Sequence, residues 1–163
     1  MNHEKIISLD GLKKYWFDSY ENVLFTNGCF DLFHAGHAKA LNDIKKDSQS
    51  NCFLIVGVNS DKSIKKIKGE SRPIINQNER AYVVACHRAV DMVFIFDEEN
   101  VSSYIKMIRP NFWYKSSDYD IKSINQEERL SIEEVNGEIK FINLVDGIST
   151  SKIINKIGGI FIE

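Results

Sequence analysis

Cysteine, proline and long apolar runs are all scarce in this chain. Of its 163 residues, 3 are Cys and 2 are Pro. The cysteines, Cys29, Cys52 and Cys86, are odd in number and show no C-x-x-C spacing, which fits neither a disulfide framework nor a zinc site. We therefore expect reduced thiols, and a core that folds without crosslinks, since a chain of this length can bury enough surface.

Signals for a membrane or for export are also missing. The longest strongly apolar stretch, residues 52–58, is far shorter than the ~20 residues that cross a bilayer. The first residues include Glu4 and Asp10 and have neither an apolar core nor a small-residue cleavage site, so they do not resemble a signal peptide. These absences predict no membrane partner and a cytoplasmic location.

Neither sign of charge dominates the chain. It has 21 basic and 23 acidic residues, which gives a formal net charge of −2. A protein that binds nucleic acid or membrane surfaces without specificity needs a strong overall field. We therefore expect no nucleic-acid partner, and any anion site must be local.

Short apolar runs alternate with segments of helical periodicity. This alternation is typical of βαβ units, and the nearly continuous apolar character of CFLIVGV and MVFIF indicates strands covered on both faces. The pattern predicts one Rossmann-like α/β domain over residues 1–163, with a doubly wound, parallel, five-stranded sheet and helices on both faces. The expected strands are 22–26, 52–59, 92–96, 112–115 and 138–143. The expected helices are 9–19, 35–47, 60–67, 76–87, 99–108, 125–135 and 149–157.

The loop after the first strand, NGCFDLFHAGHAKAL, draws attention because ligands of such sheets bind at the carboxyl ends of the strands. It is neither a dinucleotide loop nor a Walker loop, since GxGxxG and GxxxxGK[ST] are absent from the chain. His34 and His37 are three residues apart at the start of the next helix, so both rings can face one ligand. A helix N-terminus with two imidazoles suits a phosphate. A metal is the competing ligand, but the sequence offers no obvious third donor.

The segment TNGCFDLFHAGHAKAL resembles the His-x-Gly-His segment of the nucleotidyltransferase superfamily that contains cytidylyltransferases and heptose-phosphate adenylyltransferases. The segments GVNSDKSIKKIKGESRP, NERAYVVACHRAVDMVFIFDEE, RPNFWYKSSDY and LVDGISTSKII follow in the order of that family, over residues 22–157. The closest resemblance is to heptose 1-phosphate adenylyltransferases, the nucleotidyltransferase domain of ADP-heptose synthases. Glycerol-3-phosphate cytidylyltransferases come next, but their RTEGISTT is here LVDGISTS, with Leu144 and Val145 in place of Arg and Thr.

The resemblance implies transfer of a nucleoside monophosphate from an NTP, with ATP favoured over CTP, to a phosphorylated sugar or polyol. It also implies Mg²⁺ that arrives with the nucleotide, and a homodimer. Because fold and site are separable, a nucleotide-binding regulatory protein is the alternative that is not an enzyme.

The resemblance further assigns residues to roles. His34, His37 and Lys68 would act on the triphosphate, while Lys62, Lys65 and Lys66 are expected on a solvated helix face. Contacts with the nucleotide would come from Asn27, Gly28, Cys29, Phe30, Arg80, Lys115, Gly147, Ser149, Thr150 and Ser151.

Several of these residues have an alternative, structural role. Gly28 can adopt a positive φ, and Cys29 can be a small buried spacer. Arg80 can form a surface salt bridge, Ser149 to Ser151 can cap the last helix, and Trp113 is expected in the core.

Contacts with the acceptor substrate would come from Asp31, Arg72 and Asp118. Asp31 has the competing role of capping the following helix. Ser116 and Ser117 replace a pair of glycines in the family pattern KGGDY, which changes the pocket beside Lys115.

Overall fold

The computed structural model describes residues 2–17, 19–48, 51–117, 123–143, 145 and 147–160. Its centre is a five-stranded, wholly parallel sheet with the strand order β3-β2-β1-β4-β5. The strands are β1 (Asn22–Gly28), β2 (Cys52–Asn59), β3 (Met92–Phe96), β4 (Phe112–Ser116) and β5 (Glu138–Ile142). The predicted α/β class and parallel sheet are confirmed.

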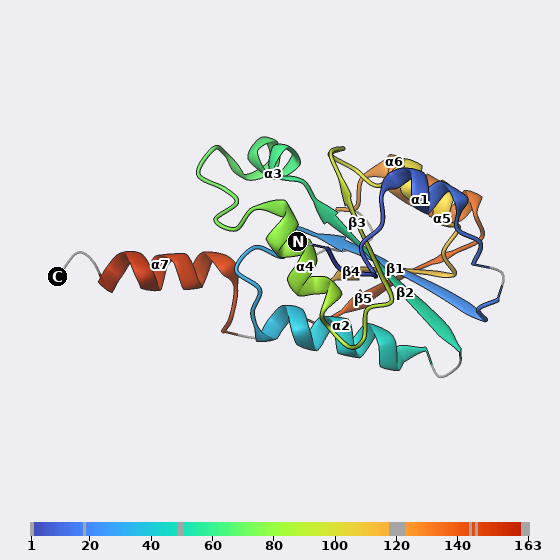
Figure 1. Cartoon of the computed structure of the whole chain (residues 1–163), viewed down its shortest axis with the longest axis horizontal. Coiled ribbons are helices and arrows are strands. Elements are labelled where there is room, and N and C mark those ends of the chain that lie inside the picture. Colours follow the sequence, from blue (N-terminus) through green and yellow to red (C-terminus); the bar gives the residue numbers. More distant parts are fainter. Residues whose placement is uncertain are drawn as a thin grey trace.

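Helices cover both faces of the sheet, because alternate side chains of each strand point to opposite sides. Along β1, Val23 and Phe25 face one apolar cluster and Leu24 faces the other. The first cluster packs under α1 (Leu9–Lys14), α5 (Ser102–Ile108) and α6 (Gln126–Glu134), and the second under α2 (Ala35–Asp47) and α4 (Gln77–Ala85). These two layers are visible on opposite sides of the strands in Figure 1.

Two further helices lie at the carboxyl end of the sheet. They are α3 (Asp61–Lys68), which follows β2, and α7 (Thr150–Ile160), which follows β5. Helix α7 has no buried residue, and Figure 1 shows it extending away from the rest of the molecule. None of the helices in the described parts of the chain is long and apolar enough to cross a membrane.

The first helix is shorter than the predicted 9–19. It begins after its cap Ser8 and ends at Lys14, where Tyr15 adopts an extended backbone. The aromatic side chains that follow pack against Phe53 instead of continuing the helix: the ring centroid of Phe53 lies 5.6 Å from that of Tyr15 and 4.5 Å from that of Tyr20. Tertiary aromatic contacts therefore override the helical pattern in this segment.

The chain reverses its winding direction between β1 and β4. β1 pairs with β2 on one side and with β4 on the other, so the loops after β1 and β4 diverge to opposite faces. This divergence opens a crevice at the carboxyl edge of the sheet, the usual ligand position in such folds. The predicted site residues are concentrated in these loops.

Candidate active site

A cavity of about 330 Å³ lies at this crevice. It is bounded by the end of β1, the first turns of α2, the end of α3, the end of β4 and the start of α7. The predicted residues that line it are Asn27, Gly28, Cys29, Phe30, His34, His37, Lys68, Lys115, Ser149, Thr150 and Ser151. The fold thus brings together segments that are more than a hundred residues apart in sequence.

The loop after β1 has an unusual backbone. Phe30 and Leu32 adopt left-handed conformations, with φ of 51° and 47°, which non-glycine residues take only at an energetic cost. Gly28 was expected to supply a positive φ, but it belongs to β1 and is not among the positive-φ residues. Its lack of a side chain serves packing instead, since a Cβ there would lie 3.3 Å from the Phe30 ring.

The two histidines cap α2 together. His34 is the N-cap, and its Nδ1 accepts a hydrogen bond from the backbone N–H of Gly36 at 3.2 Å. The Nδ1 atom of His37 accepts from the backbone N–H of His34 at 3.3 Å. This reciprocal arrangement is a capping box in which imidazoles replace the usual hydroxyl and carboxylate. The ring centroids are 3.8 Å apart, with an interplanar angle of 20°.

The glycine between the histidines has a steric reason. A Cβ on Gly36 would lie 2.9 Å from Cε1 and 3.0 Å from Nδ1 of His34. The His34 ring can fold back over the first turn of α2 only because this position has no side chain. The spacing His-x-Gly-His is therefore a packing requirement as well as a chemical one.

These contacts define the protonation of both rings. A nitrogen that accepts a hydrogen bond carries no proton, so each neutral ring has its proton on Nε2. Burial lowers the pKa of His34. Burial, together with the nearby His34 and Lys68, lowers the pKa of His37 to about 4. In the free protein at neutral pH the pair therefore presents neutral Nε2–H donors.

The low pKa of His37 predicts a pH dependence of stability. The unfolded chain binds a proton at this residue near pH 6.5, whereas the folded chain binds it only near pH 4. The unfolded state thus binds more protons between these values, so stability falls as the pH falls. We expect wild type to lose roughly 2 kcal/mol more free energy of unfolding between pH 7 and pH 4.5 than His37→Gln. Urea denaturation at both pH values measures this difference, and equal losses would contradict it.

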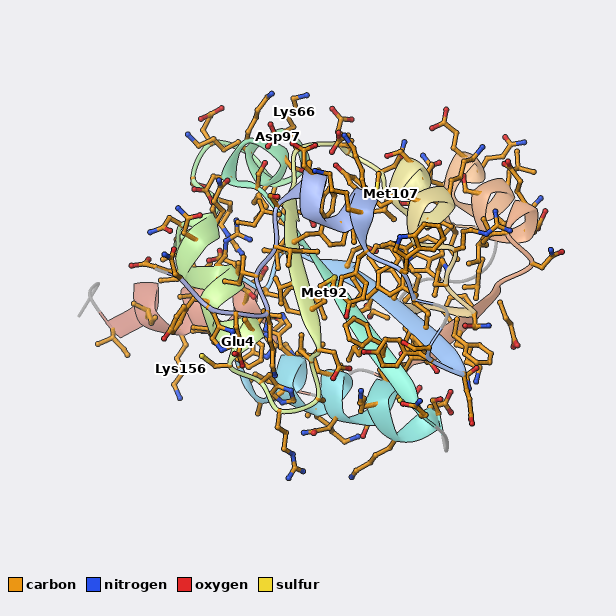
Figure 2. All side chains as sticks on the ribbon, turned by 45° about the vertical axis from the view of Figure 1, so that its right-hand side comes forward. Glu4, Lys66, Met92, Asp97, Met107 and Lys156 are labelled. Atoms are coloured by element: carbon orange, nitrogen blue, oxygen red, sulfur yellow. The ribbon has the colours of Figure 1, made fainter. Side chains whose placement is uncertain are left out.

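Lys68 is the final residue of α3 and lines the same cavity as the histidines. The other lysines of α3 point outward and are paired with exposed acids: Lys62 with Asp97, Lys65 with Glu70 and Lys66 with Glu99. Figure 2 shows Lys66 and Asp97 at the periphery of the molecule, around α3. The expectation of a solvated lysine face is confirmed.

The opposite wall of the cavity is formed by β4 and α7. Lys115 lies 4.7 Å above the Trp113 ring and 3.8 Å from the carboxylate of Glu128. Trp113 is fully buried, as expected, and its indole N–H donates to Oδ1 of Asn27 at 3.2 Å. Because the indole is only a donor, this bond leaves the Asn27 NH₂ group as the end that faces other partners.

The start of α7 combines a cap with cavity-facing hydroxyls. Ser149 Oγ accepts a hydrogen bond from the backbone N–H of Lys152 at 3.2 Å, so the expected capping role is confirmed. Ser149, Thr150 and Ser151 line the cavity. Gly147 adopts a φ of 84° and forms the turn before the helix, outside the cavity lining.

Asp31 and Arg72, expected to contact the acceptor, instead contact each other. The Asp31 side chain is 0% exposed and accepts a hydrogen bond from Arg72 Nε at 2.8 Å. Backbone hydrogen bonds from Ile74 and Ile75 and the Arg72 charge lower the pKa of Asp31, in spite of the opposing effect of burial. Asp31 does not cap α2 either, because His34 occupies that position.

Arg80 is also withdrawn from the cavity. It is 1% exposed, so it is neither a surface salt bridge nor open to a ligand. Its guanidinium donates to the backbone carbonyls of Cys29, Asn59 and Ile75 and to the carboxylate of Asp61. It therefore holds the ends of β1 and β2 and the loop before α4 together. Asp118, the remaining predicted residue, lies outside the described residues.

Sequence reasoning did not predict the apolar part of the cavity. This part is made by Ala40, Ile44, Ile142, Val145 and Ile148. Ala40 and Ile44 follow His37 at helical spacing, so the periodicity of α2 was an available signal. The other three come from β5 and the segment before α7, which only the folded chain brings close.

Cys29 is partly exposed at the cavity, and burial raises the pKa of its thiol.

Two further observations concern alternative sites. In the part of the chain that the structure describes, His, Cys, Asp and Glu side chains form no group of three or more that could hold a metal. A second cavity of about 430 Å³ lies near Tyr15, Trp16 and Arg109. None of the predicted site residues lines it.

Strand order, parallel direction and a cavity at the switch point define a Rossmann-like α/β domain. The family model described as cytidylyltransferase-like matches residues 25–156. The chain belongs to this family and is accordingly a nucleotidyltransferase.

Curated relatives carry the name "Bifunctional protein HldE". The protein from Campylobacter fetus is 43% identical over 155 residues, which is 95% of this chain and 32% of the relative. The protein from Wolinella succinogenes is 39% identical over 161 residues, 97% of this chain and 32% of the relative. The chain therefore spans about a third of the length of these relatives.

Solved structures share the fold at lower identity. A lipopolysaccharide core biosynthesis protein from Thermoplasma volcanium has a TM-score of 0.59 and 22% identity, and covers 76% of this chain and 96% of its own. Pantothenate synthetase from Thermus thermophilus also has a TM-score of 0.59, with 12% identity, and covers 91% of this chain and 67% of its own. At these identities the likeness concerns the fold alone.

Proposed function

We propose that this chain transfers a nucleoside monophosphate from ATP to a sugar 1-phosphate, with heptose 1-phosphate as the acceptor, and releases pyrophosphate. The observation that carries the proposal is the convergence of His34, His37 and Lys68 on one cavity at the carboxyl edge of the sheet. The name HldE of the relatives and the resemblance to heptose 1-phosphate adenylyltransferases support the choice of substrates.

In this reaction an oxygen of the acceptor phosphate attacks the α-phosphorus of the nucleotide. The bond between the α-phosphorus and the bridging oxygen breaks, and pyrophosphate leaves with the electron pair. The attacking oxygen is already anionic, so no side chain has to remove a proton from it. Catalysis then depends on positioning and charge stabilisation, which are the contributions that donors and cations can make.

The residues of the cavity fit these requirements. The Nε2–H groups of His34 and His37 would donate to phosphate oxygens, and the first turn of α2 adds the positive end of its dipole. Lys68 would neutralise the charge that develops on pyrophosphate. The N-terminus of α7, with Ser149 and Thr150, would bind phosphate from the other wall, and the apolar residues leave room for the base.

Magnesium would arrive as part of the nucleotide substrate. Hard cations of this kind prefer oxygen ligands, and Mg²⁺ is commonly held by substrate phosphates. The described residues that line the cavity include no carboxylate, so the triphosphate would supply the ligands. When bound, the ion neutralises phosphate charge.

The proposal also covers assembly and location. We expect a homodimer, as the resemblance implies, and the apolar residues on α7 such as Ile157 and Ile160, which are 46% and 63% exposed, are a surface that association would cover. Sedimentation velocity tests this expectation. A cytoplasmic location follows from the use of a nucleoside triphosphate as substrate.

Pyrophosphate release tests the function directly. ATP, CTP, GTP and UTP are each combined with heptose 1-phosphate, other sugar 1-phosphates and glycerol 3-phosphate. We expect release with ATP and heptose 1-phosphate above all other pairs. Release with CTP and glycerol 3-phosphate would instead indicate a cytidylyltransferase. Nucleotide binding without release from any pair would support the regulatory alternative.

A further inference from the structure

Asp31 lies at the centre of a buried junction beside the cavity. Both of its carboxylate oxygens are occupied: Oδ1 accepts from the backbone N–H of Ile75 at 3.0 Å, and Oδ2 accepts from that of Ile74 at 3.0 Å. Oδ2 also accepts from Arg72 Nε at 2.8 Å, and Arg72 Nη2 lies 2.7 Å away. A carboxylate with 0% exposure and these partners has no position for a substrate.

The hydrogen-bond partners of the Asp31 side chain belong to the loop 69–75, which directly follows Lys68. Gly69, Glu70, Ser71 and Ile74 are exposed, so apolar packing contributes little to holding this loop. Within the loop, Arg72 N donates to Gly69 O at 3.1 Å. Asp31 links the loop directly to the end of β1, and Arg80 adds a second link, because it donates to the carbonyls of Ile75 and Cys29.

The position of Asp31 is itself strongly determined. It stands between the left-handed residues Phe30 and Leu32, a backbone that persists only where surrounding contacts impose it. Its carbonyl accepts a hydrogen bond from Thr150 Oγ1 at 2.8 Å. One residue thus joins the β1 loop and the start of α7, which line the cavity, to the loop that directly follows Lys68.

We propose that Asp31 is a positioning residue that latches the loop 69–75 to the end of β1 and thereby holds Lys68 at the phosphate end of the cavity, without touching either substrate. The inference rests on the proposed function and deepens it, because Asp31 acts through Lys68. It replaces the contact with the acceptor that the sequence had suggested for Asp31 and Arg72.

Hydrogen exchange tests the latch independently of activity. Asp31→Asn keeps the shape of the side chain and removes its charge, while Asp97→Asn alters an exposed carboxylate whose partner is Lys62. We expect the amides of Ile74 and Ile75 to exchange at least about tenfold faster in Asp31→Asn, since they lose a charged acceptor, and at the wild-type rate in Asp97→Asn. Unchanged exchange in both variants would overturn the latch.

A double-mutant cycle with Lys68→Met tests the consequence for catalysis. Asp31→Asn alone should lower turnover about 100-fold through misplacement of Lys68, without raising KM for the acceptor. In the Lys68→Met background the same change should cost less than about threefold, because coupled residues are not additive. Full additivity, or a raised acceptor KM with unchanged kcat, would overturn the proposal in favour of substrate contact.

Misfolding of the variant and failure of the proposed function can both be distinguished from failure of the latch. If Asp31→Asn fails to fold, Arg72→Ala removes the charged partner but leaves both backbone contacts, and the same exchange and cycle measurements apply to it. If the wild type releases no pyrophosphate with any substrate pair, the proposed function fails, while faster or unchanged exchange at Ile74 and Ile75 still decides the latch.

Discussion

Replacing His37 with Ala is expected to lower turnover by about 10²- to 10³-fold, as loss of one well-placed donor does in comparable sites. The Nδ1 of His37 is used by the backbone of His34, so its Nε2–H is the group left for a phosphate oxygen. Alanine removes this donor and also one half of the helix cap. Steady-state pyrophosphate release measures the effect, and circular dichroism checks that the fold is kept.

His3→Ala is the matched control, because His3 is a histidine outside the cavity whose Nδ1 accepts a backbone hydrogen bond from Lys5. It should retain the wild-type rate. His37 also completes the capping box of α2 from position N3, and His37→Gln separates the two roles, since glutamine at N3 keeps the capping box. Full recovery of turnover in His37→Gln would mean that the reaction needs the cap and not the imidazole.

Replacing Lys68 with Met is expected to lower turnover on the order of 100-fold and to raise KM for the nucleotide, because a cation placed at the leaving phosphates stabilises the developing charge. Methionine keeps much of the length and apolar stem of lysine, so the fold should be unaffected. Lys68 is exposed at the end of α3, so its replacement removes no buried contact from the core.

Lys65→Met is the control on the same helix, because its ammonium group pairs with the exposed carboxylate of Glu70. Such exposed pairs contribute little, and we expect unchanged kinetics. Equal losses in the two variants would show that the general positive charge of α3 matters rather than one placed ammonium group.

The two substitutions test different parts of the cavity. His37→Ala tests the hydrogen-bond donor at the start of α2, and Lys68→Met tests the cation at the end of α3. If the cavity binds nucleotide without reacting, both variants should weaken binding and neither has a turnover to lose. Isothermal titration with a non-hydrolysable nucleotide distinguishes this case.

Local signals in the chain were sufficient for the strands, the helix order and the histidine motif. Apolar runs such as MVFIF and periodic segments such as 35–47 depend on interactions between near neighbours, so each can be identified without the rest of the fold. The histidines and the hydroxyl residues at the start of α7 were predicted because they adjoin a helix N-terminus, and Lys68 was predicted because its segment resembles a loop of the family.

The contacts that the side chains of Asp31, Arg72 and Arg80 make depend on tertiary structure. A charged side chain in a loop has several possible partners, and sequence does not say which lies within reach. Folding brings the loop 69–75 beneath the end of β1, where burial makes an unpaired charge costly. Asp31 and Arg72 therefore bind each other, and Arg80 binds Asp61 and backbone carbonyls, while His34, His37 and Lys68 line the cavity. Local chemistry decided which groups could act on a phosphate, and long-range packing decided which of them line the cavity.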